Sequence, residues 1–432
     1  MQLLTLQNFC PELSDEEVLK IAQKTGFVKR VEKKITANEY LFYFCQESIK
    51  GTVSYNDLAA KISCEQICNA SRQAYYYRTK QEAVMFFEQI LATVMKHKYQ
   101  VCDLNKTNIK EKFRRILIQD STIIRLPQKL YEIFSGVKNA KSVVCNARIQ
   151  GVYDLLAGEF TSFSIDSYSD NDLKVAENID VVKGDLVLRD RGYFLISAIE
   201  NMKNKGADSI LRYKHKTKFY DPVSHKEINL LNLLKQLGSL DITLLCGKNK
   251  NTKLRIIAAP VPEEIANLRR MKAKKEAKGR MCSKELLQLM AWTIFITTIE
   301  NQDFNFQQAG ILYALRWRIE SIFKTWKSNL NFDKIHNVSE VQLRVLLNAR
   351  FIMITLLYQS IFNPFEKLIL AKTNKQLSLM KFMRFISKNF DQFVRKFYCS
   401  NNIDEAIDIL KRYCTFDKRN RKRFGHGFYF DK

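Results

Sequence analysis

Four short β-rich runs lie close together between residues 114 and 214, and their order restricts the fold more than any other feature of the sequence. The runs cover residues 114–127, 141–166, 185–194 and 208–214, and Gly and Asp residues interrupt them. Residues 195–206, between the last two runs, have helical spacing and end on a glycine. Strands followed by a strand–helix–strand unit predict a mixed α/β sheet. Helical patterns flank this region, in residues 1–112 and again after about residue 333.

The charge balance indicates a polyanionic partner. The chain has 70 Lys and Arg residues against 45 Asp and Glu residues, a formal net charge of +25. Each phosphate that a basic side chain neutralises releases condensed counterions, so a charge of this sign favours nucleic acid. A basic surface kept only for solubility is the alternative.

Other residue types restrict the cellular setting. The sequence has no run of about 18 apolar residues, and its N-terminus turns acidic where a signal peptide would have its cleavage site. The ten cysteines are scattered without a C-x-x-C pair, and the five histidines include no closely spaced pair. We therefore expect a soluble cytoplasmic protein with no membrane partner, whose thiols act as small apolar residues. The same spacing argues against a zinc centre.

Two short helical patterns between residues 53 and 83 resemble a helix-turn-helix. In that motif the second helix enters the major groove of DNA. It would here present Arg72, Gln73 and Arg78 to bases and phosphates. A plain helical hairpin is the alternative, because the short turn between the two patterns has no glycine.

Two aspartates each follow an apolar strand run: Asp120 ends ILIQD and Asp190 ends LVLRD. A buried strand seldom ends on a carboxylate unless a counter-charge or a metal ion is near, because burying an unpaired charge is costly. The alternatives are structural. Asp120 could cap a turn through Ser121 and Thr122, and Asp190 could pair with a neighbouring arginine.

Residues 311–332 predict an amphipathic helix with a narrow polar stripe. At 100° per residue, four polar residues fall within an arc of about 60°: Tyr313, Arg316, Glu320 and Lys327. Lys324 lies at the border of this stripe, and apolar residues on the neighbouring arc can anchor the helix to a sheet. A solvated helix with an Arg316–Glu320 pair would have the same stripe. Together with the two aspartates, however, Glu320 would complete the hard-oxygen ligands of a two-metal phosphoryl-transfer centre.

The stripe residues complete the spacing Y-x2-R-x3-E-x6-K, which resembles the signature of insertion-sequence family four among the bacterial DDE transposases. Asp120 in QDST and Asp190 in RDRGYF are similar to the first and second aspartate motifs of that family. The similarity spans residues 113 to about 330. The regions on either side match only in being helical and basic.

The resemblance implies a ribonuclease-H-like catalytic core inside an α/β chain. Asp120, Asp190 and Glu320 would then be the catalytic residues and the ligands of two Mg²⁺ or Mn²⁺ ions. It also implies five segments: a helical DNA-binding region (1–112), a first part of the core (113–214), a mainly β insertion (215–285), a second part of the core with the signature helix (286–335) and a helical, basic C-terminal region (336–432).

The resemblance further implies a reaction on double-stranded DNA, at the transposon ends and at the target. In this group a metal-activated water nicks the end of the element, the 3′-hydroxyl makes a hairpin on the opposite strand, and water reopens it before target joining. Tyr313, Arg316 and Lys327, with Lys324 beside them, would contact phosphates near the cut. The group also acts as a DNA-bound homodimer.

The same group flips a base near the hairpin, which requires an aromatic side chain for stacking. The 215–285 segment has no tryptophan, so Phe219 or Tyr220 is expected to substitute. Two other functions remain open from the sequence. One is a structure-specific DNA nuclease or resolvase on the same fold, and the other is a non-catalytic DNA-binding relative.

Overall fold

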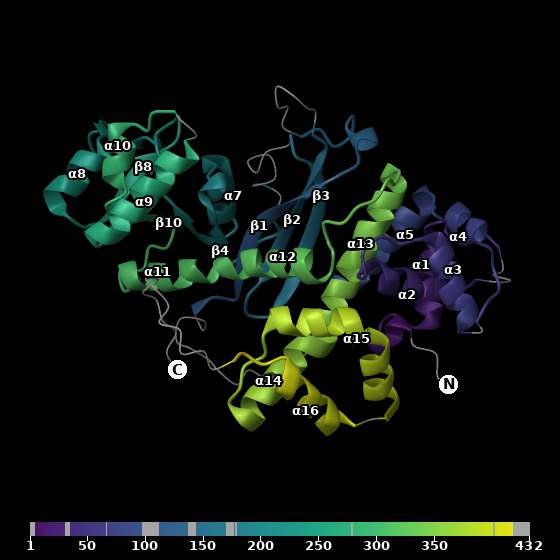
Figure 1. The fold of residues 1–432 in the computed structure, drawn as a ribbon. Coiled ribbons are helices and arrows are strands. Elements are labelled where there is room, and N and C mark those ends of the chain that lie inside the picture. Colours follow the sequence, from purple (N-terminus) through teal and green to yellow (C-terminus); the bar gives the residue numbers. More distant parts are fainter. Residues whose placement is uncertain are drawn as a thin grey trace.

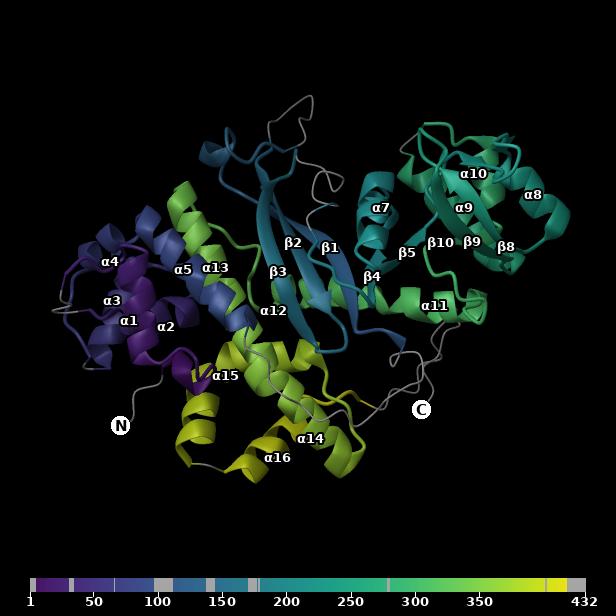
Figure 2. The ribbon, with the colours of Figure 1, turned by 180° about the vertical axis from the view of Figure 1, so that it is seen from behind.

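The computed structural model describes residues 5–30, 35–65, 67–96, 112–136, 144–169, 177, 179–277, 280–400 and 402–417. These residues build a central sheet with a helical region beyond one edge, an α/β extension beyond the other, and C-terminal helices below (Figure 1). A single long helical segment crosses beneath the sheet from the extension towards the helical region, and the view from behind shows the same arrangement (Figure 2). The expected α/β class with helical terminal regions is confirmed.

The described strands form one mixed sheet in the order β3-β2-β1-β4-β5-β10-β9-β8-β6-β7. Its first half comprises β1 (Arg115–Arg125), β2 (Asn146–Asp154), β3 (Glu159–Ser167), β4 (Asp185–Arg189) and β5 (Asp208–Arg212). β1 pairs antiparallel with β2 and parallel with β4, and β4 pairs parallel with β5. Helix α7 (Ile196–Asn204) makes the crossover between β4 and β5. Three antiparallel strands followed by two parallel ones are the order expected of a ribonuclease-H-like core.

The 215–285 segment continues the same sheet. It carries β6 (Phe219–Tyr220), β7 (Glu227–Ile228), α8 (Leu230–Leu237), β8 (Leu240–Cys246), β9 (Thr252–Pro260) and α9 (Glu263–Glu276). Helix α10 (Lys284–Leu289) then leads to β10 (Trp292–Thr297), which pairs antiparallel with both β5 and β9. The description of the segment as mainly β is too narrow, because α8 and α9 contain 22 residues and its four strands 20.

The N-terminal region is helical, as expected. It comprises α1 (Asp15–Lys24), α2 (Ala37–Ser48), α3 (Tyr55–Cys64), α4 (Arg72–Arg78) and α5 (Gln81–Lys96). Ser14 begins α1 by accepting a hydrogen bond from the backbone N–H of Glu17. Gly26 follows its end with a φ of +74°, a conformation that a glycine adopts without strain.

The C-terminal region packs against both the N-terminal helices and the sheet. Its helices are α13 (Glu340–Leu356), a π-helical turn (Leu357–Phe362), α14 (Asn363–Thr373), α15 (Leu379–Ser400) and α16 (Ile403–Tyr413). Among the described residues one helical run, Glu340–Thr373, is long and apolar enough to cross a membrane, but 94% of its apolar window is buried inside the protein. It is therefore a core helix.

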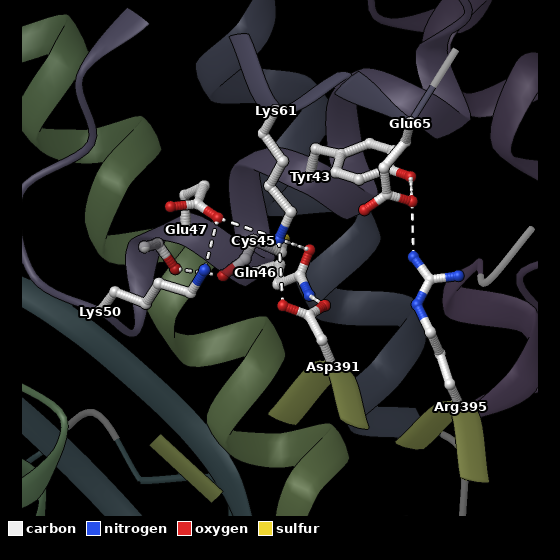
Figure 3. A network of polar contacts seen from close by, with 10 residues as sticks. Tyr43, Cys45, Gln46, Glu47, Lys50, Lys61, Glu65, Asp391 and Arg395 are labelled. Carbon is white, nitrogen blue, oxygen red and sulfur yellow. Dashed lines mark hydrogen bonds and ion pairs between the residues drawn. The ribbon is translucent and has the colours of Figure 1, made fainter. Parts of the chain in front are cut away.

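Two sets of polar contacts attach the N-terminal helices to the rest of the chain. The buried Arg350 of α13 donates hydrogen bonds to backbone carbonyls on both sides, including those of Ser48 (2.9 Å) and Phe332 (2.8 Å). The second set joins α15 to α2 and α3 (Figure 3). In it, Arg395 pairs with Glu65 at 2.5 Å and Asp391 lies 3.4 Å from Lys61. Because Glu65 directly follows α3, these contacts fix the start of the connection to α4.

Candidate active site

The register of the sheet places Asp120 and Asp190 in one row. The last parallel pair between β1 and β4 is Gln119 with Arg189, so Asp120 and Asp190 are the next residues on neighbouring strands. Neighbouring strands are about 4.8 Å apart. The sequence suggested that the strand ends at Asp120. This is wrong, because β2 continues to pair with β1 as far as Arg125. What ends before Asp120 is the pairing with β4.

Both carboxylates belong to the face of the sheet that the long crossing helix covers. Side chains alternate along a strand, so Asp120 shares a face with Ile118, and Asp190, whose backbone is still extended, shares one with Leu188. Ile118 and Leu188 belong to the same hydrophobic cluster as Ile319. The cluster on the opposite face contains the intervening residues Leu117 and Val187.

The crossing helix consists of α11 (Phe306–Leu315) and α12 (Trp317–Asn329), which meet at Arg316. The single helix expected over residues 311–332 is therefore divided. Arg316 still has helical backbone angles, φ −53° and ψ −32°, so the polar stripe is retained across the junction. The apolar side of α12 is anchored by residues that are almost completely buried: Ile319, Ile322, Phe323 and Trp326.

Arg316 bridges two of the three candidate catalytic carboxylates. Its Nη1 lies 3.5 Å from Oδ2 of Asp120, and its Nη2 lies 2.5 Å from Oε1 of Glu320. The Arg316 side chain is only 12% exposed. The Arg316–Glu320 pair that a solvated helix would also make is thus present. It lies against the sheet, however, and Arg316 also contacts Asp120 on β1. A solvated helix would not bring Arg316 into contact with Asp120 on β1.

The electrostatics of Asp120 bring all three carboxylates into one neighbourhood. Burial, with a smaller contribution from the negative charges of Glu320 and Asp190, raises the pKa of Asp120 to about 7. The backbone N–H of Ser121, which donates to Oδ1 at 2.8 Å, and the charge of Arg316 oppose this shift. The expected contact with Ser121 is therefore real, but it does not neutralise the carboxylate. Asp120 consequently lies near two other carboxylates and one guanidinium, that of Arg316.

The donor set suits a hard divalent cation. Carboxylate oxygens are the ligands that Mg²⁺ and Mn²⁺ prefer. A bound cation would also reduce the repulsion between neighbouring carboxylates. In the described part of the chain, however, no three His, Cys, Asp or Glu side chains lie close enough together to enclose a metal ion. Arg316 supplies the positive charge between Asp120 and Glu320 instead.

The remaining stripe residues extend to either side of the carboxylates. The Tyr313 ring lies 5.5 Å from that of Phe295 on β10, and burial raises the pKa of its hydroxyl to about 12. At the other end, Nζ of Lys327 donates to the carbonyl oxygen of Ile123 on β1 at 2.6 Å. Lys324 is exposed. The stripe therefore spans the sheet from β10 to β1.

The three residues expected to read DNA ends have different surroundings. Arg72 and Gln73 are exposed on α4. Arg78 instead donates to the carbonyl oxygen of Ile35 at 2.7 Å, and its guanidinium lies 5.0 Å from the ring centroid of Phe27. Its side chain is thus engaged in the packing of the N-terminal helices, which leaves Arg72 and Gln73 as the accessible members of the set.

The two aromatic residues expected to stack on a base are poorly placed for it. Phe219 is completely buried, and the Lys250 ammonium lies 4.5 Å from the ring centroid of Tyr220. Trp317, which the sequence reasoning missed, is 64% exposed and directly follows Arg316. A helical wheel would have shown it, because Trp317 lies about 40° from Tyr313, just outside the polar stripe.

Comparisons with known proteins show the family to which the chain belongs. A family model described as "Transposase DDE domain" matches residues 111–356. The transposase for insertion sequence element IS231B of Bacillus thuringiensis subsp. berliner is 28% identical, over 96% of this chain and 91% of that protein. The transposase for IS1151 of Clostridium perfringens is 25% identical, over 94% and 92%. A piggyBac transposase in a synaptic complex with hairpin DNA has a TM-score of 0.44 at 10% identity, covering 96% of this chain and 86% of that one.

Proposed function

Since the chain belongs to the transposase DDE-domain family, whose members are phosphoryl-transfer enzymes that act on DNA, we propose that it moves an insertion sequence. In this proposal it binds the terminal inverted repeats, cleaves the strands at each end with the help of divalent metal ions, makes a hairpin intermediate and joins the freed element to target DNA. The observation that supports the proposal is that Asp120 and Asp190 follow the last paired residues of neighbouring strands, while Arg316 links Asp120 to Glu320.

Asp120, Asp190 and Glu320 would hold two Mg²⁺ or Mn²⁺ ions. When bound, the ions supply Lewis-acid chemistry at the phosphoryl oxygens. For this the Arg316 side chain has to release Asp120 and Glu320. A guanidinium forms bidentate bonds with phosphate as readily as with carboxylate, so a DNA phosphate is the natural replacement partner for Arg316.

The stripe on α11 and α12 supplies the other DNA contacts in the proposal. With a pKa raised to about 12, the Tyr313 hydroxyl keeps its proton at neutral pH and can donate it in a hydrogen bond to a phosphate oxygen. Lys324 is exposed and Lys327 lies against the C-terminal half of β1. These two ammonium groups would neutralise phosphates that flank the cut.

Trp317 is the best-placed stacking residue for the hairpin step. A hairpin turn forces bases out of the stack, and an exposed aromatic ring stabilises a base that has left it. The ring of Trp317 is exposed beside Arg316, whereas Phe219 is buried and Tyr220 is engaged with Lys250. We therefore assign the stacking role to Trp317.

The remaining parts of the proposal concern assembly. Arg72 and Gln73 on α4 would contact the end sequence, and a homodimer would bring two ends together on the DNA. The five segments expected from the sequence would keep their roles, with residues 1–112 reading DNA and the core between 113 and 335 cutting it. The protein would act in the bacterial cytoplasm, in keeping with its bacterial relatives.

The experiment is a nicking assay on duplexes that carry the inverted repeats bordering the gene, with Mg²⁺ or with a chelator. We expect metal-dependent nicks at the repeat ends, which Asp120→Asn, Asp190→Asn and Glu320→Gln abolish while DNA binding persists. Arg344→Gln is the control, because it removes an i,i+4 pair with Glu340 on another helix. Cleavage without metal, or full activity in all three carboxylate variants, would refute the proposal.

A further inference from the structure

The row of residues that contains the two aspartates continues onto the next strand. Arg189 of β4 pairs with Leu211 of β5, so the residue beside Asp190 is Arg212. Arg212 also shares the face of the aspartates, because Ile210 belongs to their hydrophobic cluster and Leu211 to the opposite one. One row across the sheet therefore reads Asp120, Asp190, Arg212.

Arg212 has no acceptor within the part of the chain that the structure describes, where it makes neither a hydrogen bond nor an ion pair. Its guanidinium lies instead over two aromatic rings, 5.4 Å from the centroid of Phe295 and 6.0 Å from that of Tyr313. Burial, with a smaller contribution from the charge of Arg269, lowers the pKa of Arg212 to about 10, against the opposing effects of Tyr313 and Asp190. A guanidinium has five N–H donors, so the half-buried Arg212 has donors that a ligand can bind.

Arg269 adds a second guanidinium from α9, outside the core strands. It donates to the carbonyl oxygen of Trp292 at 3.1 Å and to Oγ1 of Thr293 at 3.0 Å. Thr293 lies two residues before Phe295 on β10, so both side chains are on the same face of the strand. Arg269 therefore lies near Arg212, and the two positive charges repel each other. The bonds to Trp292 and Thr293 use only some of the N–H groups of Arg269.

Two neighbouring guanidiniums that are partly buried and short of acceptors form a favourable site for an anion. Their mutual repulsion and their desolvation are both relieved when a group with several acceptor oxygens lies between them. The exposed Arg191, which directly follows Asp190, adds positive charge on the same side. Asp190 lies between Arg212 and Asp120 in the row, and its charge also acts on Arg212.

We propose that Arg212 and Arg269 bind a backbone phosphate of DNA on the β5–β10 side of the carboxylates. The inference rests on the proposed function, which supplies the DNA. It gives α9 a direct part in DNA binding. Arg212 lies beside Tyr313, and Lys327 lies 14 residues, or about 21 Å, further along the crossing helix. DNA phosphates would therefore be bound near both ends of that helix.

The test is DNA binding without chemistry. In a Glu320→Gln background and without divalent metal, the affinity for a short duplex oligonucleotide is measured over a series of salt concentrations. Each phosphate contact that is lost should lower the slope of log affinity against log salt by about 1. We expect that decrease, with weaker binding, in Arg212→Met and in Arg269→Met. Arg212→Lys should keep the slope because it keeps the charge.

Arg255→Met is the matched control. Arg255 lies on β9 of the same sheet, but Asp241 and the carbonyl oxygens of Asn301 and Phe304 already satisfy its guanidinium. Its loss should lower the melting temperature and leave the salt slope unchanged. Arg212→Met should instead lower the salt slope, because it removes a charge that makes no hydrogen bond or ion pair with the described residues.

Equal affinities and slopes in the parent, Arg212→Met and Arg269→Met would overturn the inference. If Arg212→Met did not fold, Arg269→Met would decide the question alone. The outcome is separate from that of the nicking assay. A chain that nicks inverted repeats but has unchanged slopes refutes only the phosphate site, and a chain with changed slopes that never nicks refutes only the proposed function.

Discussion

Arg316 contacts Asp120 although 196 positions separate them in the sequence, and the same guanidinium holds Glu320 one helical turn away. The positive charge between the two carboxylates is therefore part of the protein. Any cation that binds there competes with it. This relationship leads to the first prediction.

Replacing Arg316 with Gln should make the fold depend on divalent metal. Without the guanidinium, Asp120 and Glu320 repel each other at short range, so the metal-free melting temperature should fall. Addition of Mg²⁺ or Mn²⁺ should raise it by more in Arg316→Gln than in the native chain, because the ion no longer competes with the arginine. DNA cleavage should fall by about 10²-fold, since the phosphate loses a charged donor. Equal metal-induced shifts in the two proteins would contradict this, as measured by thermal unfolding.

The stability of the metal-free protein should depend on pH through Asp120. Burial raises the pKa of its carboxyl to about 7, so the folded chain binds this proton more tightly than the unfolded chain does. The contribution of the group to stability is thus fully present below about pH 4 and is lost as the pH rises to about 7. Asp120→Asn removes the ionisation. The variant should gain stability relative to the native chain over this range, by on the order of 2–4 kcal/mol at pH 8.

Urea denaturation of both proteins at several pH values measures that difference. Asp166→Asn is the control, because Asp166 lies on β3, outside the carboxylate cluster. A constant difference between Asp120→Asn and the native chain from pH 4 to pH 8 would show that Asp120 titrates normally.

Trp317→Ala should impair hairpin formation more than the first nick. Stacking of a base on an aromatic ring contributes about 1–3 kcal/mol, so the hairpin yield should fall by about tenfold or more. The first nick needs no unstacked base and should be nearly unchanged. Trp317→Phe should restore part of the yield because it keeps a ring. The assay separates nicked and hairpin products on a denaturing gel, and an equal loss of both products would argue against a stacking role.

Breaking the contact between Arg395 and Glu65 should loosen the connection that precedes α4. The pair is one of the contacts between α15 and the N-terminal helices (Figure 3), and both side chains are largely buried, 23% and 20% exposed. Arg395→Met should therefore increase hydrogen exchange in α3 and α4 while the sheet stays protected. Lys396→Met, which removes an exposed pair with Glu405, is the control. Unchanged exchange in α3 and α4 would mean that α15 does not hold them.

The sequence predicts the elements of this fold well because their patterns are local. Alternating and helical periods identify the strands of the core, the signature helix and the flanking helices. The sequence predicts the length of a strand less well. β1 extends beyond Asp120 because β2 pairs with it as far as Arg125, and a partner strand leaves no mark on the pattern of ILIQD.

The site could be predicted in type but not in detail. Asp120 and Asp190 could be proposed because each follows an apolar strand run, and Glu320 because it belongs to the polar stripe and to the family signature. The bridge through Arg316 depends on contacts between distant segments. The burial of Phe219 likewise follows from its packing, with Tyr213 at a ring distance of 6.1 Å, which residue type alone does not show.

We propose that Asp120, Asp190 and Glu320 together hold two divalent ions. Titration of the DNA-bound protein with Mn²⁺, followed by electron paramagnetic resonance, counts the bound ions directly. We expect two tightly bound ions per chain, and fewer in each of Asp120→Asn, Asp190→Asn and Glu320→Gln. The same number of tightly bound ions in the native chain and in all three variants would contradict the account.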